Sequence, residues 1–338
     1  MSTLKDIAQK TGFSVTTVSR ALNGYFDVNE STRKMIIQAA KDLNYSPNIL
    51  ARGLVTKRSK TIGFLISDLK RESAKDGFMF NTLCGLSDAL STSEYEFVLL
   101  STTIYKKRGK TFRQLCTERQ LDGVIIQGLK MDDPYLQEAA TAHIPCVVID
   151  IPMEAENICS VTSNQQESAA HAVRYLYRMN HRRIAFVNGA PHAHVSHMRK
   201  LGYETALQDL GLEVKVEYIV DGDFSEDKAR QVTIPLLLNH PQITAIFCAS
   251  DVMALGVLKA AGELDIEVPT QLSVIGFDNI LLARYVTPPL TTIGQSPYQL
   301  GAAAAELLIQ YLEEEKCPPS IVIENELVIR DSVAFYQF

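Results

Sequence analysis

Short apolar runs recur along the chain from Thr61 onward, separated by segments with the length of helices. Continuous runs of Val, Ile and Phe are typical of parallel strands that are buried on both faces. The alternation of such strands with helices predicts a doubly wound α/β fold with parallel sheets. The strand candidates cover residues 62–67, 97–101, 123–127, 146–150, 184–188, 218–221, 245–249 and 273–276. The pattern restarts near residues 157–164, which predicts two sheets.

The first 60 residues lack the strand pattern and predict three short helices instead. An apolar stripe around Ile7 indicates the first helix. The third is expected to begin after Asn29 or Ser31, both good N-cap residue types, and to end before Pro47. Three short helices of this kind can share one small hydrophobic core.

The second of these helices has one face suited to packing and one suited to DNA. At about 100° per residue, Val18, Ala21 and Leu22 lie on one face of the helix. Thr16 and Arg20 lie on the opposite face. In the major groove, Arg can bind guanine with two hydrogen bonds and Thr can contact a thymine methyl group. This segment is therefore a candidate DNA-reading helix.

Charge divides the chain at about the same place. Residues 1–60 hold ten Lys or Arg against four Asp or Glu, a net charge of +6. Residues 61–338 hold 23 basic against 35 acidic residues, a net charge of −12. A basic segment before an acidic body indicates that only the first part meets phosphates.

Composition narrows the class of protein further. Hydrophobic residues make up 46% and charged residues 21% of 338 residues, as in ordinary globular proteins, and two or three domains are expected. Lys5 and Asp6 interrupt any secretory signal, so a cytoplasmic location is expected. Asp251 and Lys259 interrupt the longest apolar run, which argues against a membrane span. The six cysteines form no C-x-x-C pair and are expected to be reduced thiols.

Several stretches resemble the LacI/GalR family of bacterial repressors over nearly the whole chain. The N-terminal ones are TLKDIAQKTGFSVTTVSRALNG, STRKMIIQAAKDLNYSPNILARGL and TIGFLISD. Later ones are NHRRIAFVNG, RKLGYETAL, RYVTPPLTTIGQ and ENELVIRDS, and the most specific is FCASDVMALGVLKAAGELDIEVPTQLSVIGFDN. The resemblance implies a helix-turn-helix head, a hinge helix and a two-lobed body like a periplasmic binding protein.

The resemblance also implies the domain boundaries. The head is expected at residues 1–46, the hinge helix and linker at 47–60, and the effector-binding and dimerisation domain at 61–338. In this family the chain crosses between the lobes three times. Lobe 1 is expected at about 61–160 and 293–324, and lobe 2 at about 161–290 and 325–338.

The resemblance assigns DNA contacts to the head and the hinge. Val15, Thr16 and Arg20 are expected to contact bases. The residues expected near the DNA backbone are Ser14, Thr17, Ser19 and Asn23. Asn48 and Arg52 of the hinge are expected at the DNA as well, with Leu54 as a wedge that unstacks a base step in the minor groove. Gly53 departs from the usual family residue, and glycine weakens a helix by roughly 0.5–1 kcal/mol relative to Ala, so a weak hinge helix is expected off DNA.

The resemblance places an effector cleft between the lobes. Its expected contacts are Phe78, Asn164, Arg199, Phe224, Ser250 and Asp278. The chemistry suits a sugar, because carboxylates accept from paired hydroxyls, Arg donates to hydroxyl oxygens and Phe offers a flat apolar face. Competing interpretations remain at two positions, where Arg199 is a surface helix residue and Phe224 a core aromatic.

Two loops leave alternatives open. After Asp68 the chain is longer and more charged than in the family, with Lys70, Arg71 and Glu72, so this segment either covers the cleft or forms a solvated loop. The segment PHAHVSH carries His192, His194 and His197 without an accompanying Cys or carboxylate set, which favours loop histidines over a metal site.

The expected function is that of a homodimeric, sequence-specific DNA-binding regulator, not an enzyme. The chain lacks G-x-S-x-G, G-x-G-x-x-G and phosphate-loop motifs, and no cofactor or metal is expected. The main hypothesis is a repressor released from a palindromic operator by a small sugar or sugar phosphate. One alternative is a corepressor-dependent regulator that responds to a nucleobase or a phosphorylated carrier protein. Another is a sensor whose head binds a protein.

Overall fold

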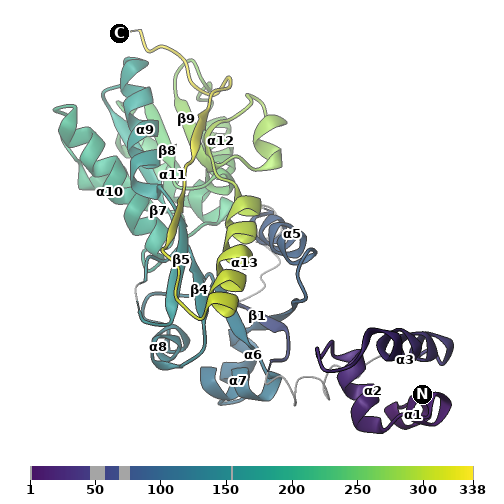
Figure 1. Cartoon of the computed structure of the whole chain (residues 1–338). Helices are drawn as coiled ribbons and strands as arrows, with labels where there is room; N and C mark the ends of the chain where they lie inside the picture. The colour runs from purple at the N-terminus through teal and green to yellow at the C-terminus, as the bar shows by residue number, and fades with distance from the viewer. Residues whose placement is uncertain (1, 46–57, 68–76, 154, 338) are drawn as a thin grey trace. The chain divides into compact units, whose positions relative to one another are not determined.

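A computed structural model of the chain describes residues 2–45, 58–67, 77–153 and 155–337 (Figure 1). The chain divides into two compact units, Met1–Ser59 and Lys60–Phe338, called the head and the body below. No helix among the described residues combines the length and the apolar character needed to span a bilayer.

The described part of the head is a bundle of three helices around one small core. The helices are α1 (Leu4–Thr11), α2 (Val15–Leu22) and α3 (Glu30–Asp42). Thr3, Ser14 and Asn29 are their N-caps, and each accepts a hydrogen bond from a backbone N–H of the first turn. Gly12 ends α1 with a φ of 74°, which only glycine adopts at little cost. The fully buried side chains at the centre are Ile7, Val18 and Ile36.

The first lobe of the body is built on a parallel sheet in the order β11-β5-β4-β3-β1-β2. Its strands are β1 (Thr61–Ile66), β2 (Glu96–Ser101), β3 (Gly123–Gln127), β4 (Cys146–Ile149), β5 (Ile158–Ser163) and β11 (Ile321–Ile323). Its helices are α5 (Phe78–Leu90), α6 (Thr102–Lys107), α7 (Phe112–Arg119), α8 (Pro134–Thr141) and α13 (Pro297–Glu314). Two buried apolar clusters include side chains from its strands and helices.

The second lobe repeats the plan with the order β12-β10-β9-β8-β6-β7, in which only the β10–β12 pair is antiparallel among the described strands. Its strands are β6 (Ile184–Asn188), β7 (Ile219–Asp221), β8 (Ala245–Cys248), β9 (Ser273–Asp278), β10 (Thr291–Gly294) and β12 (Glu326–Val328). Its helices are α9 (Gln165–Arg178), α10 (His194–Asp209), α11 (Glu226–Asn239) and α12 (Asp251–Glu263), with short 3-10 turns η2 (Val216–Tyr218) and η3 (Leu281–Arg284). The predicted fold class, a helical head and an α/β body with two parallel-type sheets, is confirmed.

The chain passes between the two sheets at three places. It leaves the first sheet after β5, returns after β10 and leaves again between β11 and β12. The expected lobe boundaries near residues 160 and 293 fall inside strands rather than between them. β5 pairs with the first sheet along its length and β10 pairs with β9 of the second sheet, so the chain crosses only after each strand has ended. The crossovers themselves lie at Asn164, Gln295 and residues 324–325.

Helices α5 and α13 pack against each other at very short range in the first lobe (Figure 1). A methyl group placed on Gly85 of α5 would lie 1.9 Å from the carbonyl oxygen of Tyr298 in α13. A methyl group on Gly301 of α13 would lie 2.1 Å from the carbonyl oxygen of Thr82. Glycine at both contact points therefore lets the two backbones touch.

A buried histidine ties the end of the described chain to the second lobe. His181 is 2% exposed, its Nε2 lies 3.1 Å from the carbonyl oxygen of Ala334, and its Nδ1 lies 2.9 Å from the hydroxyl of Thr244. Because a carbonyl only accepts, Nε2 carries the proton and Nδ1 accepts from the hydroxyl. Burial lowers the pKa of His181 from 6.5 to about 4.

This histidine predicts a loss of stability in mild acid. The unfolded chain binds a proton at His181 below its unfolded pKa of 6.5, while the folded chain resists it down to about pH 4. The free energy of unfolding should therefore fall by about 3 kcal/mol between these pH values. Urea unfolding of the wild-type chain and His181→Gln across this range measures the difference. Equal pH slopes in the two proteins would contradict this assignment.

Candidate DNA-reading helix and effector cleft

One face of helix α2 packs into the hydrophobic core of the head, as predicted. Val18 and Ala21 are buried and Leu22 packs partly buried against the same core. The Ser14 hydroxyl accepts from the backbone N–H of Thr17 at 3.0 Å and fixes the start of the helix. The opposite face is therefore held in a defined position.

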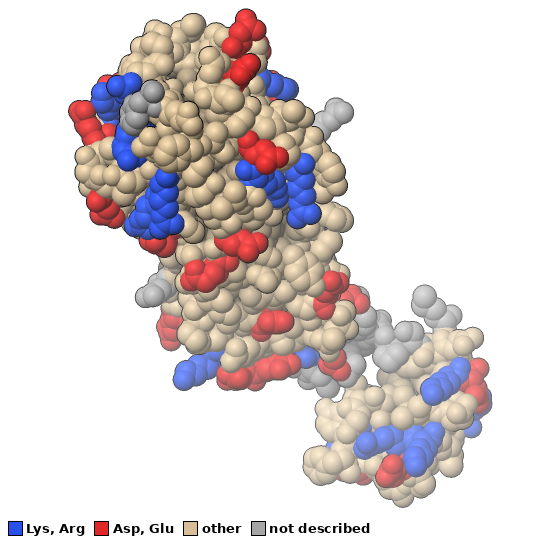
Figure 2. All heavy atoms as spheres, turned by 90° about the horizontal axis from the view of Figure 1, so that it is seen from above, with Lys and Arg blue, Asp and Glu red and all other residues tan. Residues whose placement is uncertain are grey.

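The outward face carries the side chains expected to contact bases. Val15, Thr16 and Arg20 are exposed, as is Ser14. The other residues expected near the DNA backbone, Thr17, Ser19 and Asn23, are half-buried. Basic side chains are prominent on the visible face of the head in Figure 2. The exposed face of α2 thus combines hydrogen-bond donors and acceptors with the cationic side chain of Arg20, which suits DNA recognition.

Arg20 is not free in this structure. Its Nε lies 3.2 Å from Oδ1 of Asp27, and its Nη2 lies 2.5 Å from Oδ2 of the same carboxylate. The guanidinium carbon also lies 5.1 Å from the ring centroid of Tyr25. This pair was not predicted from the sequence, because its members are seven positions apart and Asp27 lies in the loop after α2.

The hinge predictions lie outside the described residues. Asn48, Arg52 and Leu54, together with Gly53, fall within residues 46–57, which the structure does not describe. Their DNA contacts and the weak hinge helix stay predictions.

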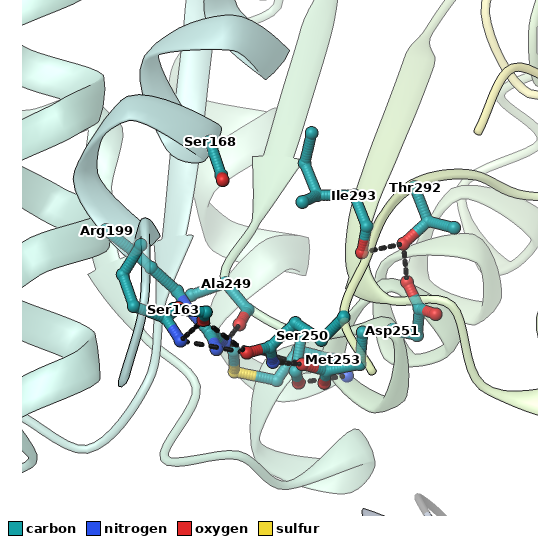
Figure 3. A network of polar contacts seen from close by, with 12 residues as sticks. Ser163, Ser168, Arg199, Ala249, Ser250, Asp251, Met253, Thr292 and Ile293 are labelled. Carbon is teal, nitrogen blue, oxygen red and sulfur yellow. Dashed lines mark hydrogen bonds and ion pairs between the residues drawn. The ribbon is translucent and has the colours of Figure 1, made fainter. Parts of the chain in front are cut away.

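The expected effector cleft lies where the carboxyl ends of the strands of both sheets meet. Asp150 follows β4, Ser163 ends β5, Asp278 ends β9 and Gln295 follows β10. Ligands of doubly wound sheets bind outside the carboxyl ends of the strands. Figure 3 shows Arg199 extending from α10 into this region, close to Ser163 and the carbonyl of Ala249.

Arg199 is the central cation of the cleft and is only 3% exposed. Its Nε donates to Oε1 of Gln165 at 2.8 Å, and its Nη1 donates to the carbonyl oxygen of Ala249. Nη1 also lies 3.7 Å from Oδ1 of Asp278, and the guanidinium carbon lies 3.8 Å from the ring centroid of Phe277. The alternative of a surface position for Arg199 is therefore wrong.

Gln295 connects the lobes at a crossover. Its amide nitrogen donates to Oδ1 of Asp278 at 2.7 Å. Its amide oxygen accepts from the Ser163 hydroxyl at 3.1 Å and from the amide of Gln165 at 2.8 Å. Ser163 belongs to the first sheet and Asp278 to the second, so this one side chain bridges both lobes.

Asp150 has an unusual electrostatic position on the first-lobe side of the cleft. Its Oδ1 is buried without a hydrogen-bond partner, and its φ is 62°. Burial raises the pKa of Asp150 to about 6, although the charge of Arg199 lowers it in part. An orphaned carboxylate oxygen facing a polar cleft can accept from a ligand hydroxyl.

Ser250 and Phe224 have structural roles besides any ligand contact. The Ser250 hydroxyl accepts from the backbone N–H of Met253 at 3.2 Å and caps α12 (Figure 3). The next residue, Asp251, is fully buried and accepts from the Thr292 hydroxyl at 2.6 Å and the Ile280 N–H at 2.8 Å. Phe224 is half-buried, lies over Gly189 after β6 and packs partly on the second-lobe core.

Asn164 holds the crossovers together. Its side-chain oxygen accepts from the Asn325 N–H at 2.9 Å and from the Ser168 hydroxyl at 2.8 Å, and its amide donates to Glu324. Asn164 also lines a pocket of about 460 Å³ with Asp150 and His194. These side-chain bonds are made to the third crossover and to α9, and the expected effector contact of Asn164 stays a prediction.

Phe78 and Asp278 line a second pocket of about 580 Å³ at the cleft. Phe78 begins α5, so it brings a first-lobe aromatic ring to the second-lobe carboxylate. The charged segment that precedes it, residues 68–76, lies outside the described residues. Its proposed cover over the cleft stays a prediction.

His192 precedes α10, but His194 and His197 lie in the first turn of this helix, so the expectation that all three are loop histidines is wrong. Among the described residues, no group of three or more His, Cys, Asp or Glu is placed to hold a metal ion. Burial lowers the pKa of His194, and the neighbouring His197 lowers it further. Sequence reasoning missed Asp150, Gln165 and Gln295. Asp150 ends the predicted strand 146–150, which was a usable signal, whereas Gln165 and Gln295 follow β5 and β10, two strands that were not predicted.

Comparisons with known proteins match both parts of the chain. The model for bacterial regulatory proteins of the lacI family matches residues 3–48, and that for the periplasmic binding protein-like domain matches residues 173–333. Catabolite control protein A of Priestia megaterium is 34% identical over 322 residues, 95% of each chain. The HTH-type transcriptional repressor PurR of Histophilus somni is 32% identical over 335 residues, 98% of this chain and 99% of the relative.

Solved structures agree over almost the full length. The CelR–cellobiose complex of a transcriptional regulator has a TM-score of 0.75 and 29% identity, covering 98% of this chain and all of that one. The lac repressor dimer bound to operator and the anti-inducer ONPF has a TM-score of 0.81 and 25% identity, covering 98% and 99%.

A head with an outward-facing reading helix, joined to a body with a polar cleft between two lobes, defines a DNA-binding transcriptional regulator. The named relatives are regulators of transcription rather than enzymes. The chain belongs to the LacI family of bacterial regulatory proteins, and the family resemblance seen in the sequence is confirmed.

Proposed function

We propose that the chain is a homodimeric repressor that binds a near-palindromic operator through α2 and leaves it when a small neutral sugar enters the cleft. The observation that carries this proposal is the bridge made by the Gln295 side chain. It joins Asp278, the carboxylate proposed to bind the sugar, to Ser163 of the other lobe. A sugar hydroxyl that donates to Asp278 competes with the Gln295 amide and so changes a contact between the lobes. The sugar can therefore have different affinities for two arrangements of the lobes.

The charges of the described cleft support a neutral ligand. One buried guanidinium, Arg199, faces the carboxylates of Asp150 and Asp278. An anionic sugar phosphate would add negative charge beside both carboxylates, which costs free energy at low dielectric. A neutral sugar instead offers hydroxyls that donate to the carboxylates and accept from the guanidinium.

Dimer formation is supported by exposed apolar side chains on the body. Leu281 and Tyr285 are 69% and 75% exposed, on and beside η3. One head has a small footprint, so two heads on a dimer are needed to read a near-palindrome with high specificity. The lac repressor relative is a dimer on its operator, which supports the same arrangement here.

The proposal is tested with DNA chosen by the protein itself. The full-length chain selects a duplex from a randomised library, and fluorescence anisotropy then measures its Kd with D-glucose, D-galactose, cellobiose, glucose 6-phosphate or hypoxanthine. A neutral sugar should raise the Kd by about 5- to 150-fold. Strengthening by hypoxanthine would support the corepressor alternative instead. Failure to select any duplex at low salt would contradict DNA reading and favour a protein-binding head.

A further inference from the structure

The Arg20–Asp27 pair leaves a specific part of the guanidinium open. An arginine guanidinium carries five N–H donors: one on Nε and two on each Nη. Asp27 takes the side formed by Nε and Nη2. The end formed by Nη1 and the second hydrogen of Nη2 stays unused by this carboxylate. That end is the two-donor fork that fits O6 and N7 of guanine.

The loop that carries Asp27 is fixed in place from the other side. Arg33 of α3 donates from Nη2 to the carbonyl oxygens of Tyr25 at 2.6 Å and Val28 at 3.4 Å. Val28 is buried in the head core. The carboxylate of Asp27 is therefore held by a loop that is tied at both ends.

The ring of Tyr25 limits the guanidinium further. It lies 5.1 Å from the Arg20 guanidinium carbon, within the range of a cation–π contact. Carboxylate and ring together restrict a side chain that would otherwise sample many rotamers at an exposed position.

We infer that Asp27 is a positioning residue for DNA recognition, which aligns Arg20 so that its free end meets a guanine. The inference rests on the proposed base-reading role of Arg20. Asp27 does not itself need to touch a base. Its negative charge also lies on the face that approaches phosphates, so it weakens binding to sequences that offer Arg20 no guanine.

Two measurable effects of opposite sign follow for Asp27→Asn. Immobilising a side chain on binding costs about 0.5–1.5 kcal/mol, which corresponds to about 2- to 12-fold in affinity. The preference for guanine over adenine at the base pair read by Arg20 should fall by this factor in each half-site. Affinity for a non-specific duplex should rise, because a negative charge near the phosphates is lost. A loss of folding would lower both affinities.

The head offers a matched control. Asp42 pairs with Lys10 at 2.9 Å and has a side-chain exposure close to that of Asp27, 44% against 41%. Asp42→Asn removes the same charge from an exposed ion pair but leaves Arg20 untouched. It should keep the guanine preference of the wild-type chain.

The experiment uses the full-length dimer and the duplex that the wild-type protein selects. Arg20→Ala first identifies the base pair whose guanine preference depends on Arg20. Kd values for guanine and adenine duplexes at that position are then measured for Asp27→Asn, Asp27→Ser and Asp42→Asn, with thermal melting of each variant as a folding check.

The outcomes separate the inference from the proposed function. A reduced guanine preference in both Asp27 variants, with Asp42→Asn unchanged, supports the positioning role. If Arg20→Ala abolishes the preference while both folded Asp27 variants retain it, the positioning role is wrong and base reading stands. If Arg20→Ala changes no preference at any base pair, base reading by Arg20 fails, and the inference fails with it.

Discussion

Arg199→Met should make the regulator insensitive to its effector. Arg199 contacts Gln165, Ala249 and Asp278 while being 3% exposed, so its replacement by Met leaves buried acceptors without their donor. Removing one member of a buried, hydrogen-bonded charge pair costs about 2–5 kcal/mol of binding free energy. The effector concentration needed for half-maximal release of operator should therefore rise at least about 30-fold.

The control for this variant is another arginine of the same lobe. Arg174 of α9 is partly exposed, pairs with Glu167 and Asp209, and does not itself line either of the two pockets described at the cleft. Arg174→Gln should leave the effector response unchanged. Unfolding of Arg199→Met is followed in parallel, since loss of a buried partner also destabilises the fold by about 3–5 kcal/mol. A folded Arg199→Met protein that responds like wild type would contradict the cleft assignment.

Arg20→Ala should remove operator discrimination and leave weak, salt-sensitive binding. A good two-donor contact to guanine contributes about 1–3 kcal/mol of discrimination in each half-site. Contacts to phosphate do not depend on sequence and weaken steeply with salt. The variant should therefore bind the selected operator and a scrambled duplex with nearly equal Kd.

Titrations of both duplexes over a range of salt concentrations measure this effect. Lys34→Ala is the comparison, because Lys34 is a highly exposed cation of α3 whose ion pair with Glu30 spans 3.7 Å. That change should alter both Kd values by the same factor or not at all. Unchanged specificity in Arg20→Ala would show that another residue reads the base pair.

Strands buried on both faces could be predicted from sequence, whereas the lobe-joining strands could not. Strand β3 is buried at every position and has the continuous apolar run that this burial requires. Strand β11 has three residues, and its pairing with β5 joins segments 160 residues apart. Its strand conformation depends on that distant partner rather than on its own pattern. The same holds for β10 and β12. They pair with each other although the chain between them passes through α13 and β11 of the first lobe.

Some site residues could likewise be placed from the local sequence pattern, whereas others depend on distant contacts. The outward position of Arg20 followed from helical periodicity alone, because Val18 and Ala21 specify which face is buried. Its pairing with Asp27 depends on how the loop after α2 returns, which periodicity does not encode. Arg199 was placed in the cleft by family resemblance, since nothing local marks an arginine in α10 as buried.

The threefold passage between the sheets has a consequence for the order of synthesis on the ribosome. Each lobe takes its last strand from residues 321–328, so neither sheet can be completed until almost the whole body has been translated. The three helices of the head are contiguous and can fold while the body is still emerging, as N-terminal domains commonly do. A nascent chain would thus present a finished reading helix long before it has a partner. The need for two heads on one operator would keep such unfinished chains from occupying it.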